Sequence, residues 1–138
     1  MPKKDIFHDA VKHALEKDGW LITHDPLSLK IGKIDMYIDL GAETLLAAEK
    51  DRQKIAVEIK SFLRTSRITD FYNALGQFLP YQVALEEQEP ERILYLAVPA
   101  VVYETLFEEE LIRKVMQRYP VKLIIYDPET EEIQSWIN

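Results

Sequence analysis

Residues 93–98, Ile-Leu-Tyr-Leu-Ala-Val, form an apolar run with no charged or amide side chain in it. A strand with one face in water alternates polar and apolar side chains, whereas a strand covered on both faces stays apolar throughout. We therefore expect a central strand in a mixed β-sheet flanked by helices, which is an α/β fold. The length of 138 residues, 47% of them hydrophobic, fits one domain over 1–138 with a single core.

The remaining apolar segments give the core element order α-β-β-β-α-β-α-β. An amphipathic pattern predicts a helix over about 4–17, which Gly19 ends. Ser66 is a suitable N-cap for a long helix, which Pro80 should kink or interrupt. Apolar runs between turn residues predict the other elements: strands at 20–23, 34–40, 44–49 and 54–60, helices around 100–107 and 110–118, and strands at 121–126 and 133–136. We expect the strands at 44–49 and 54–60 to form a hairpin.

The segment 54–60, Lys-Ile-Ala-Val-Glu-Ile-Lys, carries the strongest chemical pattern of the chain. Glu58 and Lys60 share one face of this strand because side chains alternate with a period of two, and Asp39 closes an earlier apolar run. Two carboxylates can hold Mg²⁺ or Mn²⁺, and an ammonium beside them can orient water or neutralise charge on a phosphate. Glu-x-Lys is a common tripeptide, but a charged pair ending a half-buried strand is costly unless it is paired or binds a cation. Asp39, Glu58 and Lys60 are therefore candidate catalytic residues, the first two as metal ligands.

Other acidic residues compete for the first carboxylate position. Glu43 and Glu49 are alternatives to Asp39, because the turn after Asp39 leaves the strand register open by a residue or two. Asp39 is preferred since it ends a strand, where functional groups collect, while Glu49 should lie at the far end of the hairpin from Glu58. Glu16, late in the first helix, is expected to face solvent.

The long helix supplies two further candidates. Gln77 and Tyr81 are four residues apart and share a helix face. They either frame the metal site as additional catalytic residues or belong to an amphipathic surface with the tyrosine half buried. The histidines His8, His13 and His24 have no metal-ligand spacing and are expected at the surface or as caps.

Composition excludes several classes of function. The net charge of −7 argues against a protein that coats nucleic acid, yet residues 30–67 hold eight basic and six acidic side chains, a balance of +2. The absence of cysteine excludes disulfides and thiolate nucleophiles, and the four glycines form no phosphate-binding loop. No apolar run approaches the roughly 20 residues that cross a bilayer, and residues 1–5 lack the apolar segment of a secretory signal, so we expect a cytoplasmic protein without membrane contact.

The candidate residues resemble a known nuclease pattern. The order of the candidate residues resembles the PD-(D/E)xK nuclease superfamily: Asp39 comes first, followed by Glu58-Ile59-Lys60. The helix pair Gln77 and Tyr81 resembles the motif of its RecB-like branch. Ile38 stands where the superfamily name has proline. Longer sequence segments along the whole chain resemble the XisH family of cyanobacteria, the fdxN element excision controlling factors. These segments lie at 5–12, 18–20, 23–27, 39–43, 56–62, 74–77, 94–97 and 126–128.

This resemblance implies a restriction-endonuclease-like core and a part in controlling site-specific DNA excision during heterocyst development. It also implies DNA, an XisI-like companion protein and a site-specific recombinase as partners, and by analogy a homodimer that cuts two strands. Two functions remain open: a metal-dependent DNA endonuclease that uses Mg²⁺ or Mn²⁺, and a non-catalytic regulatory module that docks on a recombinase, XisI or DNA.

Overall fold

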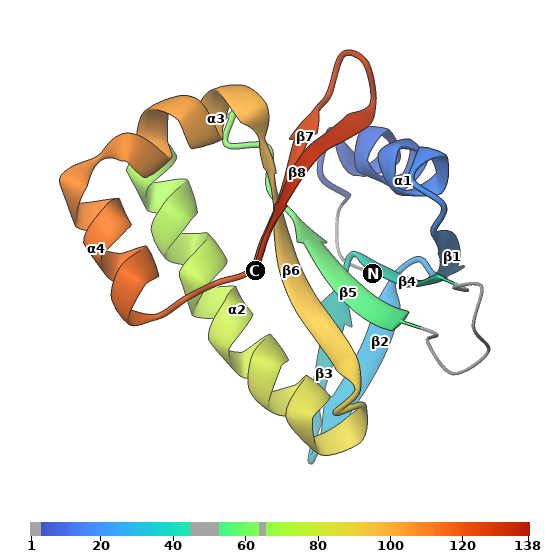
Figure 1. The fold of residues 1–138 in the computed structure, drawn as a ribbon. Coiled ribbons are helices and arrows are strands. Elements are labelled where there is room, and N and C mark those ends of the chain that lie inside the picture. Colours follow the sequence, from blue (N-terminus) through green and yellow to red (C-terminus); the bar gives the residue numbers. More distant parts are fainter. Residues whose placement is uncertain (1–3, 45–52, 64–65) are drawn as a thin grey trace.

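The computed structural model describes residues 4–44, 53–63 and 66–138, which form one mixed sheet, one separate hairpin and covering helices (Figure 1). The strand order of the six-stranded sheet is β1-β4-β5-β6-β7-β8, and β2 pairs only with β3. In chain order the elements are α1 (His8–Lys17), β1 (Leu21–His24), β2 (Leu27–Ile31), β3 (Ile34–Ile38), β4 (Leu40–Thr44), β5 (Gln53–Ile59), α2 (Arg67–Gln88), β6 (Arg92–Pro99), α3 (Ala100–Thr105), η1 (Leu106–Glu108), α4 (Glu110–Arg118), β7 (Leu123–Asp127) and β8 (Glu132–Ile137).

The predicted central strand is confirmed as β6. It pairs in parallel with β5 on one side and β7 on the other, while the outer pairs of the sheet are antiparallel. Leu96 and Val98 pack with α2 and α3 on one face of the sheet, and Ala97 joins the cluster on the α1 face. Both faces of β6 are therefore covered, which confirms the α/β architecture.

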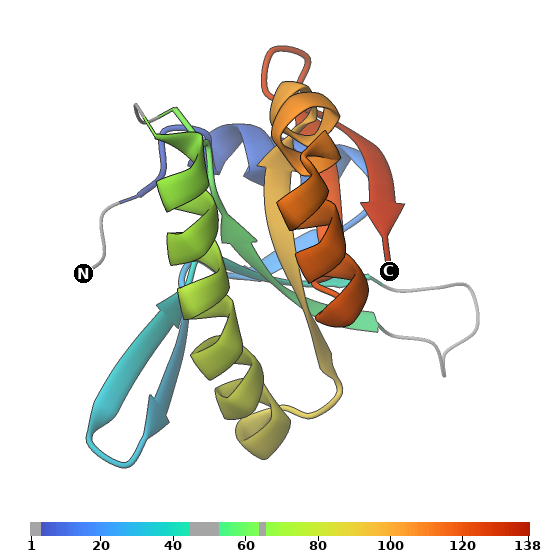
Figure 2. The ribbon, with the colours of Figure 1, turned by 90° about the vertical axis from the view of Figure 1, so that its left-hand side faces the viewer.

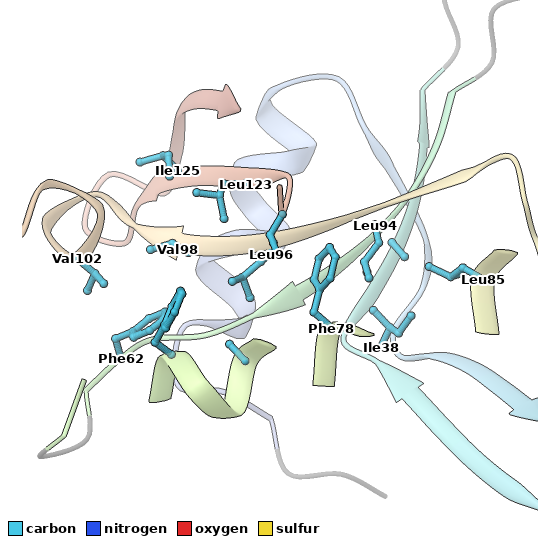
Figure 3. Close-up of a cluster of buried hydrophobic side chains, with 14 of the residues drawn as sticks. Ile38, Phe62, Phe78, Leu85, Leu94, Leu96, Val98, Val102, Leu123 and Ile125 are labelled. Carbon is cyan, nitrogen blue, oxygen red and sulfur yellow. The ribbon is translucent and has the colours of Figure 1, made fainter. Parts of the chain in front are cut away.

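Two apolar clusters lie on opposite faces of this sheet. The larger one joins β6 and β7 to α2, α3 and α4, with Phe78, Leu96 and Leu123 among its buried side chains (Figure 3). The smaller one packs α1 against the other face through Val11 and Leu15. Because odd and even residues of a strand face opposite sides, the even positions of β5 point toward α2.

Several predicted boundaries were wrong. The strand expected at 34–40 divides at Asp39 into β3 and β4, and β3 leaves the main sheet to pair with β2, a strand that was not predicted. The hairpin partner of β5 is β4, Leu40–Thr44, and not a strand at 44–49; residues 45–52 lie outside the described part of the chain. The first helix begins at His8 and not near residue 4.

The long helix α2 runs without interruption from Arg67 to Gln88, so the interruption expected at Pro80 was wrong. Ser66 is its N-cap as predicted, with its Oγ accepting a hydrogen bond from the Thr69 N–H at 3.3 Å. Pro80 and Gly76, the residue whose carbonyl loses its helical partner, both lie on the exposed side of the helix. None of the described helices is long and apolar enough to span a membrane.

Candidate functional site

Asp39 and Glu58 lie side by side and are held there by the backbone of two strands. The β4–β5 register pairs Leu40 with Val57, so the residues that come next, Asp39 and Glu58, face each other. The Ile59 N–H donates to Asp39 Oδ2 at 2.8 Å, and the Asp39 N–H donates to Glu58 Oε1 at 3.4 Å. The bend at Asp39, which the sequence did not predict, thus brings one carboxylate of the candidate pair to the other.

Lys60 completes the group on the same face of β5. Its Nζ lies 3.9 Å from Glu58 Oε2, and its side chain is 23% exposed. The Lys60 N–H donates to the Ala97 carbonyl at 3.2 Å, which keeps the chain paired to β6 for one residue beyond the end of β5. The chain then turns at Phe62, a buried residue with φ of 56°, a left-handed conformation that costs a non-glycine residue energy.

Lys60 also borders a small polar hollow. Its volume is about 290 Å³, and its lining residues come from the segment before α1, the end of β5 and the first turns of α2: Lys4, Asp5, Lys60, Ser61, Phe62, Asp70 and Asn73. Asp5 Oδ2 accepts a hydrogen bond from the Ser61 N–H at 3.0 Å, which fixes the chain just after Lys60. Lys60 therefore lies beside Glu58 and also borders this solvent-accessible space.

The electrostatics of the pair favour a bound proton or a cation. Burial above all, and then the neighbouring Asp39 carboxylate, raise the pKa of Glu58 to about 9, although Lys60 opposes the shift. Burial also raises the pKa of Asp39, against the lowering effect of the Ile59 N–H. Two buried carboxylates in contact cannot both remain charged without compensation, so near neutral pH the metal-free pair retains a proton.

A stability prediction follows from the raised pKa of Glu58. The native state holds this proton more tightly than the unfolded chain, so in EDTA the free energy of unfolding should fall as pH rises from about 4.5 to about 9. Glu58→Gln, which is neutral at every pH, should flatten this dependence and stabilise the metal-free protein at pH 8 by on the order of 2 kcal/mol. Urea unfolding between pH 5 and 9 measures both effects. The exposed Glu16→Gln is the control, and an unchanged pH slope in Glu58→Gln would contradict the assigned burial.

Helix α2 places Tyr81 near the carboxylate pair. Burial first, and then the charges of Glu58 and Asp39, raise the pKa of Tyr81 to about 12, so its hydroxyl is protonated and within electrostatic range of both. Gln77 is half buried one turn earlier, and within the described residues its buried Oε1 has no hydrogen-bond partner. Tyr81 thus lies where the functional interpretation put it, while no hydrogen bond joins Gln77 to the pair in this part of the structure.

The competing acidic residues lie elsewhere. Glu43 is opposite Lys54 in the β4–β5 register, four residues and about 13 Å along β5 from Glu58. Glu49 falls outside the described residues, and Glu16 is exposed on α1 as expected. Asp39 is therefore the carboxylate that the fold brings to Glu58.

The sequence interpretation missed the buried position of His8, which was expected at the surface or as a cap. His8 is 4% exposed, and its Nε2 lies 2.7 Å from Asp25 Oδ1, whose other carboxylate oxygen accepts from Lys12 Nζ at 3.0 Å. Its positive form lowers the pKa of Asp39, so it is electrostatically linked to the site. The signal was helical spacing, since His8 shares the buried stripe of Val11 and Leu15 at positions i, i+3 and i+7.

The donor set suits a hard divalent cation. Asp39 and Glu58 offer carboxylate oxygens, and Mg²⁺ commonly binds to one or two carboxylates with substrate phosphate and water completing its shell. In the described ranges no cluster of three His, Cys, Asp or Glu side chains forms a complete cage. The pair therefore fits an ion shared with a phosphate better than a structural metal enclosed by protein.

Comparison with known proteins identifies the family. A family model described as XisH protein matches residues 1–134. An XisH family protein from Nostoc punctiforme PCC 73102 is 47% identical with a TM-score of 0.89, over 97% of this chain and 100% of that one. An fdxN element excision controlling factor protein from Anabaena variabilis is 46% identical with a TM-score of 0.89, over 98% and 100%. No curated protein matches the chain. With a family model along nearly its full length and two solved relatives of the same shape, the chain belongs to the XisH family.

Proposed function

We propose that this XisH-family protein is a metal-dependent DNA endonuclease with a restriction-endonuclease-like core, acting in site-specific excision of a DNA element. The observation that carries the proposal is the convergence of Asp39, Glu58 and Lys60 at the junction of β4 and β5. The Anabaena relative is described as an excision controlling factor for the fdxN element, which supports the biological setting.

Each side chain has a distinct task in phosphodiester hydrolysis. Asp39 and Glu58 would hold Mg²⁺ or Mn²⁺, and the bound ion would neutralise charge on the scissile phosphate. Lys60 orients the attacking water and stabilises negative charge on the phosphate oxygens. A bond forms between the water oxygen and phosphorus and one P–O ester bond breaks. The attacking water gives up a proton to solvent, and the leaving oxygen takes up a proton from solvent. Tyr81 is protonated and can donate its O–H to a phosphate oxygen. Gln77 lies one turn earlier on the same helix, where we assign it a supporting role.

The test is DNA cleavage as a function of the metal ion. Purified protein is incubated with supercoiled plasmid and with branched oligonucleotide duplexes in Mg²⁺, Mn²⁺, Ca²⁺ or EDTA. We expect cleavage in Mg²⁺ and Mn²⁺ and none in Ca²⁺ or EDTA, since Ca²⁺ prefers larger, more flexible coordination. Absence of cleavage on every substrate in every metal would reject the endonuclease. Equal cleavage in EDTA would identify a contaminating nuclease.

A second candidate keeps the fold without the chemistry: a regulatory module that docks on a recombinase, an XisI-like companion or DNA. The net charge of −7 favours this candidate, because an acidic surface binds a protein more readily than it binds the negatively charged DNA duplex. A pulldown discriminates the two. Retention of the XisI-like protein by Glu58→Gln, together with excision that is normal in this variant, would support the module and exclude the nuclease.

A further inference from the structure

We propose that the β2–β3 hairpin is a DNA-reading ribbon that enters the major groove of the duplex beside the carboxylate pair. The inference rests on the proposed function for the choice of DNA as ligand and goes beyond it in naming the contact element. Both views show the hairpin extending away from the six-stranded sheet, along the C-terminal half of α2 (Figures 1 and 2).

The dimensions of the ribbon match the groove. Two strands lie about 4.8 Å apart, and five residues per strand span about 17 Å. A two-stranded ribbon fits the major groove of B-DNA, which is about 12 Å wide, but not the minor groove, which is about half as wide. Proteins of several folds use such ribbons to read DNA.

One face of the hairpin is fixed to the protein and the other is open. Leu27 and Leu29 are buried in the cluster that includes α2, and Gln88 of α2 donates its side-chain N–H to the Lys30 carbonyl. The register pairs Ser28 with Tyr37 and Lys30 with Asp35 on the opposite face, which is turned away from this cluster. The ribbon is therefore anchored before DNA binds, and ordering it costs no extra free energy on binding.

The open face and the tip carry groups that DNA recognises. Lys30 and Lys33 are exposed and supply cations for phosphates, while Ser28 and Tyr37 supply hydroxyls for phosphate oxygens or base edges. Lys30 Nζ lies 4.0 Å from Asp35 Oδ1, and both side chains are more than half exposed. This exposed ion pair is too weak to prevent Lys30 from binding a phosphate. Gly32, with φ of 59°, makes the tight tip that lets both strands enter a groove.

The ribbon leads directly into the carboxylate site. Strand β3 runs from Ile34 at the tip to Ile38, and the next residue is Asp39. Five residues of strand correspond to about 17 Å, the length of about five base pairs at roughly 3.4 Å each. The tip would therefore contact the duplex about five base pairs from the phosphate held at Asp39 and Glu58.

Charge reversal on the ribbon tests the contact independently of cleavage. Binding of a fluorescein-labelled 30-base-pair duplex in EDTA is followed by anisotropy across KCl concentrations. The double variant Lys30→Glu, Lys33→Glu should bind at least about tenfold more weakly and lose about two units of the salt slope. The matched control is Arg113→Glu, Lys114→Glu on α4, with the same change in charge on an exposed helix. Equal losses in both variants, or none in the ribbon variant, would overturn the proposal.

Disulfide crosslinking tests the groove. The chain has no cysteine, so Lys33→Cys introduces a single thiol at the tip. It should crosslink to a duplex carrying a thiol tether on cytosine N4, in the major groove, and not to one tethered at guanine N2, in the minor groove. Lys114→Cys should react with neither. Preferential reaction with the guanine N2 tether, or with neither duplex, would overturn the major-groove contact.

The two proposals fail in distinguishable ways. Crosslinking at cytosine N4 with no cleavage in any metal would support the hairpin's contact with the major groove and reject the endonuclease. Metal-dependent cleavage with an unchanged salt slope in Lys30→Glu, Lys33→Glu would keep the endonuclease and reject the ribbon. Thermal melting of each variant in EDTA verifies that all of them are folded before either result is interpreted.

Discussion

Lys60→Met should lower the single-turnover rate of DNA cleavage by about a hundredfold to a thousandfold while leaving Mg²⁺ binding intact. The methionine keeps most of the length of the side chain and removes only the charge that lies 3.9 Å from Glu58 Oε2. Losing one preorganised donor to the developing negative charge typically costs about 10² to 10³ in rate. Mg²⁺ affinity, measured by calorimetry, should stay equal or rise, because the ammonium is not a ligand and repels the cation.

Lys54→Met is the matched control for this loss. Lys54 lies near the start of the same strand, and its Nζ lies 3.7 Å from Glu91 Oε1, far from the carboxylate pair. The Lys54→Met variant should cleave DNA at the wild-type rate. Cleavage by Lys60→Met at the wild-type rate, or an equal loss in Lys54→Met, would show that the ammonium has no special part in the reaction. A large loss of Mg²⁺ affinity in Lys60→Met would instead point to a distorted site.

The candidate site was predictable where local periodicity determines it. Alternation along β5 is enough to place Glu58 and Lys60 on one face, and helical spacing is enough to join Gln77 to Tyr81. Tyr81 does lie within electrostatic range of the pair, whereas the interruption expected at Pro80 is absent. Proline is tolerated there because the affected carbonyl lies on the exposed side of α2, a property of tertiary packing that the residue type alone does not reveal.

The path of the chain through Asp39 was not predictable from periodicity. Residues 34–40 form one largely apolar run, so nothing in composition indicates that the strand changes partner in its middle. Pairing with β2 on one side of Asp39 and with β5 on the other depends on residues distant along the chain. The bend that presents the first carboxylate to Glu58 is therefore a tertiary feature.

The β2–β3 hairpin, in contrast, left a signal that was overlooked. Residues 27–31 alternate Leu-Ser-Leu-Lys-Ile, and Gly32-Lys33 is a two-residue turn with glycine where φ is positive. Alternation predicts a strand with one covered face, and the structure shows Leu27 and Leu29 buried on that face. No strand was predicted for these five residues.

Leu96→Ala should be among the most destabilising single substitutions in this protein. Leu96 is 1% exposed in the central strand and packs in the cluster that joins the sheet to α2. Removing a buried leucine leaves a cavity in addition to the lost transfer free energy, which together cost about 3 to 4 kcal/mol. Urea unfolding in EDTA at pH 6 measures the loss. Because Leu96 pairs with Glu58 across the β5–β6 register, the raised pKa of Glu58 should also relax toward its ordinary value.

Ile93→Ala on the same strand separates core packing from strand propensity. Ile93 is 40% exposed at the start of β6, so the same type of truncation should cost about 1 kcal/mol or less. Isoleucine is a strong strand former and alanine a weak one, so an effect of strand propensity alone would cost Ile93→Ala at least as much stability as Leu96→Ala. A loss in Ile93→Ala as large as that in Leu96→Ala would therefore contradict the burial of Leu96 against α2. Since β6 pairs with β5, such a result would also mean that the strand carrying Glu58 has no tightly packed neighbour to hold it in place.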